Sequence, residues 1–210
     1  MFHMASVRNK VIILLLLGLA ACLVFACASC ADGDDDDNNN DNNNGTPADD
    51  DTPDPEAFTL TSTAFDDLGD IPLKHACTNQ DGQNISPPLA WNNAPAETVA
   101  LALTFIDLDG PEDLVAHWGL INIPNDVSSL VEGITATNAP AGAWQTLNYR
   151  GQIQYDGPCP PSRHRYEFTL YALDTGIEDP GTGTDLFSLT DEIDQKTIAT
   201  TKLLGQFPPE

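Results

Sequence analysis

The chain has 210 residues, and 32 Asp and Glu residues against 8 Lys and Arg residues give a formal net charge of −24 at pH 7. A chain this acidic does not attract a phosphate backbone, which argues against a nucleic-acid partner. A strongly anionic membrane surface would also repel it, so any anion must be bound by a small local site.

The first 30 residues predict an export signal. Arg8 and Lys10 precede a run from Val11 to Ala31 that contains no charge. A basic start, an apolar stretch and small residues before a cysteine are typical of a bacterial lipoprotein signal. We expect the lipid on Cys22, which ends Leu19-Ala20-Ala21-Cys22, with Cys27 and Cys30 as alternatives. The run is also long enough for a retained transmembrane helix. Either way, the chain is expected in the cell envelope, periplasmic or attached to the outer membrane, with a membrane tether.

Residues 31–56 predict a disordered acidic linker. From Asp32 to Glu56 there are 11 acidic residues, and there is no basic or aromatic residue. Such a segment cannot bury enough apolar surface to offset its ordering entropy, and its like charges repel. Asp and Asn oxygens also suit calcium, but the spacing of an EF-hand loop is missing. A solvated spacer is therefore preferred to a calcium site.

Residues 57–210 are numerous enough for one domain with its own core. Alternating apolar and polar residues between turn clusters predict strands in this part of the chain. The predicted strands are Phe58–Leu60, Val99–Ile106, Val115–Ile123, Tyr149–Tyr155 and Tyr166–Leu173.

One helix is predicted near the end of the chain. Thr190 can cap it, and Asp191 and Glu192 suit its first turn. The positions that follow at helical spacing are Ile193, Thr197, Thr200 and Leu204, with Gly205 as the terminating residue. The sequence therefore predicts a mostly β domain with a C-terminal helix.

Two cysteines, Cys77 and Cys159, fall inside the predicted domain. In an oxidising exported compartment such a pair usually forms a disulfide. The bond would join the Cys77 loop to a proline-rich loop. Closing about 80 residues would stabilise the fold by on the order of 4 kcal/mol in the chain-entropy model. Two buried free thiols are the alternative.

The segment Tyr155–Leu173, YDGPCPPSRHRYEFTLYAL, places a stiff loop directly before a strand. Its three loop prolines each fix one backbone φ, so the loop can hold a shape without regular structure. His164 and Tyr166 are two residues apart, which puts both side chains on one face of the strand. By itself the segment is equally consistent with a surface hairpin that carries an incidental histidine.

Four motifs in chain order carry a resemblance to a known family. They are Ser86-Pro87-Pro88-Leu89-Ala90-Trp91, Asp107-Leu108-Asp109-Gly110-Pro111, the stretch His117–Pro124 and the stretch Gly157–Tyr166. Together they resemble the phosphatidylethanolamine-binding protein (PEBP) family, in its bacterial Raf-kinase-inhibitor-like branch, over nearly all of residues 58–207. The resemblance implies a two-sheet β fold with short helices. It also implies a small surface pocket that accepts phosphate-like or acetate-like anions.

The resemblance further implies which residues bind the ligand. They are Asp107, Gly110, Pro111, His117, Gly157, Cys159, Pro160, His164 and Tyr166. Two imidazoles and a phenol can donate to anion oxygens, a carboxylate can orient an imidazole, and glycines let backbone N–H groups approach. Two positions depart from the family's D-P-D-A-P box, Leu108 and Gly110. Val115 is expected at one wall of the pocket.

Structural roles are expected for other residues of these segments. Asp109 would cap its turn by bonding local backbone. Without the neighbouring motifs, His117 would be interpreted as a hydrogen-bonded core histidine. The remaining expectations are packing for Trp91 and Trp118, solvent exposure for Arg163 and Arg165, and a surface position for His75.

The leading functional hypothesis is a non-catalytic module that binds a small anion or a phosphorylated head group, without metal or other cofactor. One alternative is a protein-interaction or inhibitor module with a protein partner in the envelope. A less favoured alternative is a metal-dependent enzyme in which His117, His164 and Asp107 form a two-histidine, one-carboxylate site. The sequence contains neither H-E-x-x-H nor G-x-S-x-G to support an enzyme.

Overall fold

The computed structural model describes residues 56–111, 114–179, 181 and 183–208. The candidate lipidation sites Cys22, Cys27 and Cys30, and all of the predicted linker before Glu56, lie outside the described residues. In the part of the chain that is described, no helix has the length and apolar character needed to cross a bilayer.

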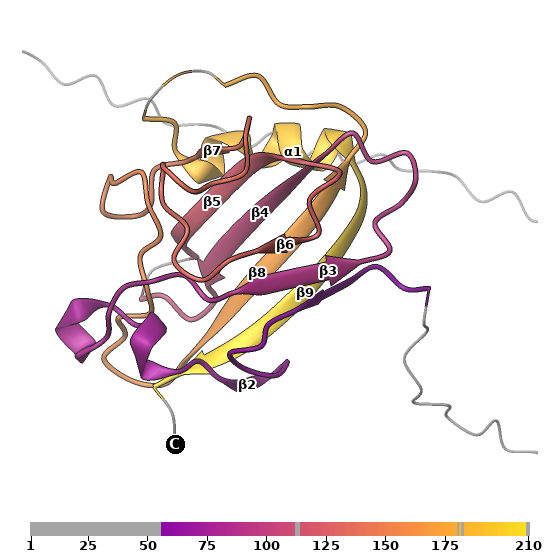
Figure 1. The fold of residues 1–210 in the computed structure, drawn as a ribbon. Helices are drawn as coiled ribbons and strands as arrows, with labels where there is room; N and C mark the ends of the chain where they lie inside the picture. Colours follow the sequence, from indigo (N-terminus) through magenta and orange to yellow (C-terminus); the bar gives the residue numbers. More distant parts are fainter. Residues whose placement is uncertain (1–55, 112–113, 180, 182, 209–210) are drawn as a thin grey trace, which may run out of the picture. The chain divides into compact units, whose positions relative to one another are not determined.

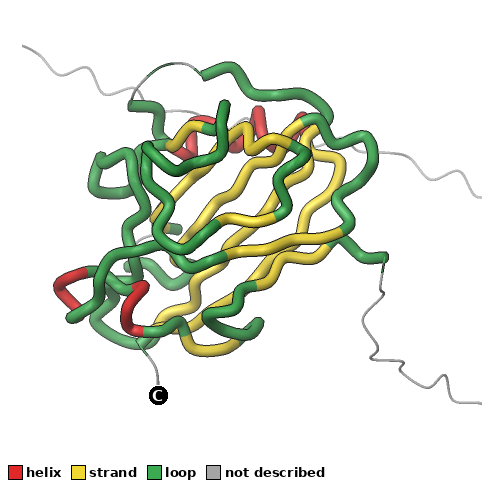
Figure 2. Tube along the Cα trace, viewed as in Figure 1, coloured by secondary structure: helices red, strands yellow, loops and turns green. Residues whose placement is uncertain are grey.

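Two β-sheets of unequal size form the domain (Figures 1 and 2). The three-stranded sheet has the order β1-β3-β6 and the six-stranded sheet the order β2-β9-β8-β4-β5-β7. The strands are β1 Thr59–Thr61, β2 Gly69–Asp70, β3 Leu89–Asn92, β4 Ala100–Asp107, β5 Val115–Pro124, β6 Ser129–Leu130, β7 Trp144–Gln145, β8 His164–Leu173 and β9 Thr197–Phe207. β2 and β9 pair in parallel, whereas the other pairs are antiparallel.

Short helices complete the domain. They are the 3₁₀ helices η1 Leu73–His75, η2 Thr78–Gln80 and η3 Leu186–Leu189, and the α-helix α1 Thr190–Lys196. The predicted mostly β fold with two sheets, short helices and a C-terminal helix is confirmed.

The main core lies between the two sheets, where Leu89 and Trp91 of β3 pack in one cluster with Phe105 of β4 and Phe168 of β8. A second cluster covers the opposite face of the large sheet, where η3 and α1 supply Leu186, Leu189 and Ile193. The central strand β4 is therefore buried on both faces. This explains its nearly continuous apolar run, ALALTFID, in place of strict alternation. Trp91 and Trp118 are both buried in the main core, as expected.

Four of the five predicted strands are confirmed as β1, β4, β5 and β8, with shifts of one or two residues at their ends. The prediction of a strand at Tyr149–Tyr155 is wrong. The side chain of Asn148 accepts hydrogen bonds from the backbone N–H groups of Arg150 and Gln152, both at 3.0 Å. Gly151 has a φ of 70°. These local bonds fold the segment into a turn and leave it unavailable to a ladder.

The predicted helix exists but is shorter than expected. α1 ends at Lys196, and residues 197–207 form β9, which pairs with β8 along its whole length. Thr190 is not the cap: its hydroxyl donates to the carbonyl of Phe187 at 2.9 Å, from within the helix. Gly205 is not a helix terminator but a strand residue packed against Ile71. β-branched residues such as Thr197 and Ile198 favour the extended conformation once β8 is available to pair with.

His75 is fully buried, so the prediction of a surface position is wrong. Its Nδ1 atom lies 2.9 Å from the carbonyl oxygen of Ile85. Its Nε2 atom has no hydrogen-bond partner among the described residues, although Oε2 of Glu132 is 4.0 Å away. A backbone acceptor therefore makes burial of this imidazole tolerable.

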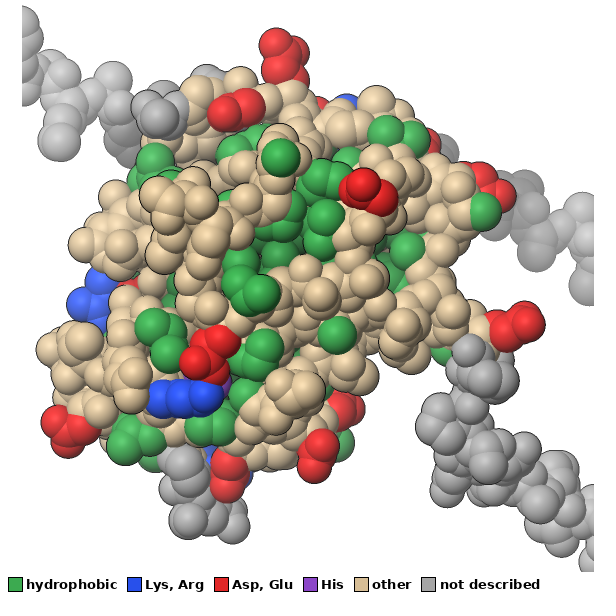
Figure 3. Space-filling view, in the orientation of Figure 1, with side chains coloured by type: hydrophobic (Ala, Val, Ile, Leu, Met, Phe, Trp, Pro, Cys, Tyr) green, Lys and Arg blue, Asp and Glu red, His purple; other side chains and the backbone are tan. Residues whose placement is uncertain are grey.

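The acidic composition is visible at the surface, where red acidic side chains outnumber blue basic ones on the face drawn in Figure 3. Each Lys and Arg residue in the described part of the chain pairs with a carboxylate. The pairs are Lys74–Glu132, Arg150–Asp156, Arg163–Asp70, Arg165–Asp109, Lys196–Glu192 and Lys202–Glu167.

Candidate ligand-binding site

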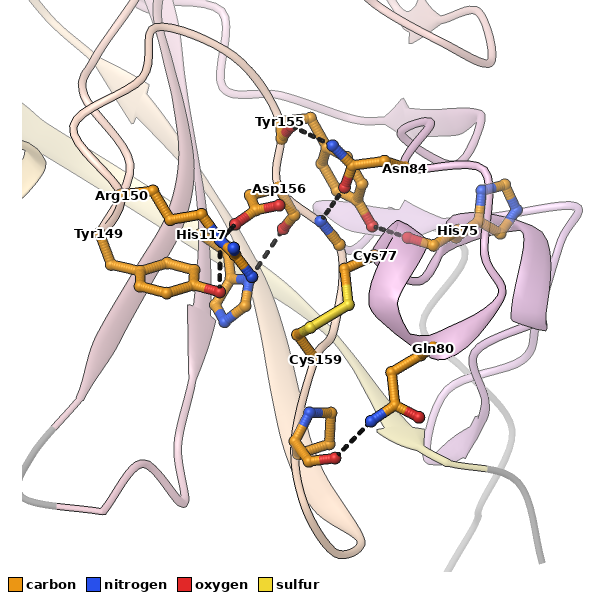
Figure 4. The surroundings of a disulfide bond; sticks show 12 residues. His75, Cys77, Gln80, Asn84, His117, Tyr149, Arg150, Tyr155, Asp156 and Cys159 are labelled. Carbon is orange, nitrogen blue, oxygen red and sulfur yellow. Dashed lines mark hydrogen bonds and ion pairs between the residues drawn. A yellow bond between two sulfur atoms is a disulfide. The ribbon is translucent and has the colours of Figure 1, made fainter.

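A disulfide holds the proline-rich loop against the η1–η2 segment (Figure 4). Cys77 and Cys159 are bonded, as predicted, with 5.4 Å between their Cα atoms. The backbone N–H of Cys77 also donates to the carbonyl of Pro158 at 3.0 Å. The side chain of Gln80 donates to the carbonyl of Pro160 at 2.8 Å. Three bonds from one short segment thus fix a loop that has no ladder of its own.

A pocket of about 270 Å³ opens beside this loop, where β4 ends and where β5 and β8 begin. Its lining residues are Asp107, Pro111, Val115, His117, Tyr149, Cys159, Pro160, Pro161, His164 and Tyr166. Strand register explains how they meet. Asp107 is opposite Val115 on β5 and opposite Tyr166 on β8.

His117 occupies an irregular position in β5. Trp118 is opposite Phe105 and Ala116 is opposite Ile106, so the register shifts by one residue and His117 has no partner on β4. Such a bulge turns a side chain away from its regular direction. The ring of His117 then lies 5.5 Å from that of Phe105 and 5.4 Å from that of Tyr166, measured between centroids.

The orientation of the His117 ring is set by one hydrogen bond. Nδ1 lies 2.8 Å from the backbone carbonyl oxygen of Asp156. A carbonyl can only accept, so Nδ1 carries the hydrogen and Nε2 is the nitrogen left for the pocket. Burial lowers the pKa of His117, and the Asp156 bond and the Asp107 charge oppose this effect only in part. The neutral ring therefore offers a lone pair to a ligand, and it becomes a donor only on protonation.

His164 is oriented by a carboxylate. Its Nδ1 atom lies 2.8 Å from Oδ2 of Asp107, and its ring stacks on that of Tyr166 with 6.4 Å between centroids. The expectation that His164 and Tyr166 share a face is confirmed. The hydroxyl of Tyr166 is buried and makes no hydrogen bond of normal geometry within the described residues. Burial and the nearby Asp107 carboxylate raise the pKa of Tyr166, so the phenol keeps its proton.

The structure brings seven of the nine expected ligand-binding residues to the pocket and leaves Gly110 and Gly157 outside its lining. The N–H of Gly157 donates to the side chain of Asn84 at 2.7 Å, so it is not available to an anion. A Cβ atom on Gly157 would lie 2.1 Å from the carbonyl oxygen of His75. The glycine is therefore required for close packing of two backbone segments.

Two lining residues were missed by sequence reasoning, Tyr149 and Pro161. Pro161 follows Pro160 directly, so the motif itself contained the signal. Tyr149 lies 32 positions after His117 and reaches it because its N–H donates to the carbonyl of Ala116 at 2.8 Å. That contact depends on tertiary structure, and no local pattern shows it.

Asp109 does not bond its own turn as expected. Its carboxylate accepts from the backbone N–H, Nε and a terminal nitrogen of Arg165 on β8. These hydrogen bonds lower the pKa of Asp109 to about 2. Asp107 makes the local contact instead, accepting from the N–H of Asp109 at 2.9 Å. Arg165 is exposed as expected, whereas Arg163 is half-buried and bonds Asp70, Gln206 and the carbonyl of Pro208.

The charge of the pocket is unusual for an anion site, because its lining contains a carboxylate and no Lys or Arg. Only the two imidazoles can supply positive charge. In the described ranges, no three His, Cys, Asp or Glu side chains are grouped closely enough to hold a metal ion.

Two packed β-sheets, with a small pocket at the strand ends beside a disulfide-fixed loop, define the class of protein as a two-sheet β-domain. The model of the phosphatidylethanolamine-binding protein family matches residues 61–208, and the chain belongs to that family.

Individual relatives agree with this assignment. A UPF0098 protein of Methanothermobacter thermautotrophicus is 40% identical over 151 residues, which cover 70% of this chain and 97% of the relative. A Mycobacterium tuberculosis protein that bears the name "Putative lipoprotein LppC" is 35% identical over 161 residues, which cover 74% of this chain and 76% of the relative.

Solved structures show the same fold. CT736 of Chlamydia trachomatis, described as a "Putative PhosphatidylEthanolamine-Binding Protein (PEBP) Homolog", superimposes with a TM-score of 0.65 at 37% identity, covering 74% of this chain and 99% of that one. YbcL of E. coli, described as a new member of the mammalian PEBP family, gives a TM-score of 0.69 at 27% identity, covering 73% of this chain and 99% of YbcL.

Proposed function

We propose that this chain is an exported, membrane-tethered binding module that takes a small oxyanion or a phosphorylated head group in the pocket, without catalysis. The observation that carries the proposal is the pairing of His117 and His164 in one pocket, each with Nδ1 already bonded to an acceptor within the protein. Their Nε2 atoms and the hydroxyl of Tyr166, which has no hydrogen-bond partner of normal geometry among the described residues, are the polar groups left for a ligand.

The charge balance sets the condition for anion binding. Neutral imidazoles present lone pairs, and Asp107 adds a negative charge, so a fully ionised anion is repelled. Protonation of an imidazole reverses this, because Nε2 then donates and carries positive charge. A ligand that brings its own proton has the same effect, as a phosphate monoester does below its second pKa of about 6. We therefore expect affinity to rise as the pH falls from 7.5 to 5.5.

Export and tethering are proposed on three grounds. The basic and apolar start of the chain ends in candidate lipidation cysteines. A relative that spans most of this chain carries lipoprotein in its name. The disulfide is consistent with an oxidising compartment.

The test is a titration of the full chain with inorganic phosphate and with phosphoethanolamine, followed by imidazole ¹H–¹⁵N NMR at pH 5.5 and 7.5. We expect the signals of His117 and His164 to shift, more at pH 5.5, while the signal of His75 stays unchanged as an internal control. No shift with millimolar ligand at either pH would overturn the proposal. Loss of the response in His117→Ala and His164→Ala, but not in Arg163→Gln, would assign it to this pocket.

A protein-interaction or inhibitor role is the second candidate, and one observation favours it. Leu114 directly precedes Val115 of the pocket lining, and Tyr149 is itself a lining residue. The two residues are 46% and 44% exposed. Exposed apolar groups beside a pocket suit a protein partner. Binding of an envelope protein that is lost in Tyr149→Ala, yet is insensitive to phosphate, would favour this role over the first.

A further inference from the structure

Arg150 lies outside the pocket but contacts two groups that shape it (Figure 4). Its Nε–H points to the hydroxyl of Tyr149 at 2.9 Å and to Oδ2 of Asp156 at 2.5 Å. The residue lines a separate polar hollow of about 260 Å³, on the Cys77 side of the disulfide, whereas Cys159 lines the ligand pocket. Arg150 is therefore not in contact with the pocket space itself, but it contacts Tyr149 of the lining and Asp156, which bonds His117.

Asp156 and His117 are bonded to each other twice. The carbonyl of Asp156 accepts from Nδ1 of His117 at 2.8 Å, and the N–H of Asp156 donates to the carbonyl of His117 at 3.2 Å. Any displacement of the Asp156 backbone would therefore move the acceptor that sets the His117 tautomer.

The side chain of Asp156 needs a partner to stay where it is. It is only 6% exposed, and Arg150 is its ion-pair partner. A buried carboxylate without a partner is costly and turns toward water or toward another donor. Here the ion pair with the Arg150 guanidinium holds the Asp156 carboxylate in its buried position.

Tyr149 is held by the same guanidinium. Its ring lies 4.9 Å from the His117 ring between centroids, and the Arg150 guanidinium carbon lies 5.1 Å from the Tyr149 centroid. Because this tyrosine is 44% exposed, burial alone does not fix its ring. The bond to Arg150 keeps it as a wall beside His117.

We propose that Arg150 is a positioning residue for the pocket: through Asp156 it selects the His117 tautomer with hydrogen on Nδ1, and through Tyr149 it fixes the wall beside that ring. The inference rests on the proposed function only for what the pocket binds. The arrangement of Arg150, Asp156 and His117 is independent of the ligand.

The charges that face His117 make the effect measurable. They are the carboxylates of Asp107 and Asp156 and the guanidinium of Arg150, while Phe105, Tyr149 and Tyr166 pack around the ring. The two carboxylates favour the protonated imidazole and Arg150 disfavours it. Removing the guanidinium therefore raises the pKa of His117, and it also takes the ion-pair partner from the Asp156 side chain.

The test is imidazole ¹⁵N NMR of the full chain without ligand, which separates the two tautomers and gives the His117 titration. Wild type should show the tautomer with hydrogen on Nδ1. Arg150→Gln should show mixed tautomers and a higher His117 pKa, and Arg150→Lys should restore both toward wild type. Arg163→Gln, which removes an ion pair elsewhere, should change neither. A wild-type tautomer and pKa in Arg150→Gln would overturn the proposal.

If Arg150→Gln does not fold, the double variant Arg150→Gln/Asp156→Asn carries the test, because it leaves no unpaired carboxylate. Mixed His117 tautomers are then expected, because the ion pair that holds the side chain of residue 156 is absent and only backbone hydrogen bonds remain there, and a single wild-type tautomer would overturn the proposal. Phosphate titration of the same samples reports separately on the proposed function. If the wild type does not bind phosphate but Arg150→Gln still changes the His117 tautomer, the proposed function is wrong and the positioning role of Arg150 stands.

Discussion

The imidazole of His164 and the carboxylate of Asp107 are joined by a 2.8 Å contact between Nδ1 and Oδ2. The contact links the first residue of β8 to the last residue of β4. The other oxygen of Asp107 accepts from the N–H of Asp109, so one side chain fixes both a histidine and the turn after β4. The Asp107 carboxylate thus positions both His164 and the turn after β4 at the pocket.

Replacing Asp107 separates its charge from its hydrogen bonding. Asp107→Asn keeps an oxygen that can accept from Nδ1, so we expect His164 to keep its tautomer. Asp107→Ala removes the acceptor, so we expect mixed tautomers at His164 in ¹⁵N NMR and an unchanged tautomer at His117. Equal behaviour of the two variants would contradict an orienting role for the carboxylate.

Removing the disulfide should destabilise the domain without changing its fold. The bond closes a loop with a sequence separation of 82 residues. Cys77→Ser/Cys159→Ser should therefore lower the free energy of unfolding in urea by about 4 kcal/mol. Dithiothreitol should lower the stability of wild type by a similar amount and have no effect on the double variant. A loss below about 0.5 kcal/mol would show that the loop is held by its hydrogen bonds alone.

Two glycines distinguish close packing from backbone conformation. Gly157→Ala would place a Cβ atom 2.1 Å from a carbonyl oxygen, and neither backbone segment can give way easily. We expect a loss of more than about 4 kcal/mol or failure to fold. Gly142→Ala meets nothing within 4 Å but has a φ of 90°, so it should cost only about 1–2 kcal/mol. Urea unfolding of both variants checks the order, and the reverse order would refute the packing argument.

The stability of the domain should fall in mild acid. Burial lowers the pKa of His75 below its ordinary value of about 6.5, and His117 behaves likewise. The unfolded chain therefore binds protons first. The contribution of these two histidines to the free energy of unfolding is fully present above pH 6.5. It declines as the pH falls toward their pKa values in the folded state. Urea unfolding at pH 5.0 to 7.5 measures this slope. His75→Gln should reduce it by up to one proton and leave the His117 contribution, and an unchanged slope would contradict the account.

The Asp109–Arg165 contact makes a prediction for a single carboxyl group. Arg165 holds the pKa of Asp109 at about 2, mainly through its side-chain hydrogen bonds. In Arg165→Gln we expect the carboxyl ¹³C titration of Asp109 to move up toward the ordinary value near 3.9. Arg163→Gln, which lacks any contact to Asp109 in the structure, is the matched control and should leave the midpoint in place.

The long strands of the large sheet could be predicted because their burial produces simple patterns. β4 is apolar almost throughout, and β8 alternates after Tyr166. β9 could not be predicted this way. Its inward-facing residues include Thr197 and Thr201, whereas Ile198 on the other face is 41% exposed. The hydrophobic alternation that marks a strand is therefore missing at its start, and helical spacing arose by coincidence.

The candidate site shows the same division. Asp107, His117 and His164 were found because each lies in a recognisable motif. The contacts of Arg150 and Tyr149 could not be predicted, since the turn that carries them depends on the Asn148 side chain and on contacts to β5. The burial of His75 likewise depends on a carbonyl at Ile85, whose position only the folded chain defines.

β9 is the last element in chain order, yet it occupies an interior place in the large sheet, between β2 and β8. A chain shortened before Thr197 would leave the whole edge of β8 unpaired and would uncover the core beneath Phe207, which is 1% exposed. The sheet therefore closes only when the final strand arrives. Until β9 pairs, the edge of β8 and the core beneath Phe207 have no cover, so the domain cannot complete its fold while its C-terminal strand is withheld.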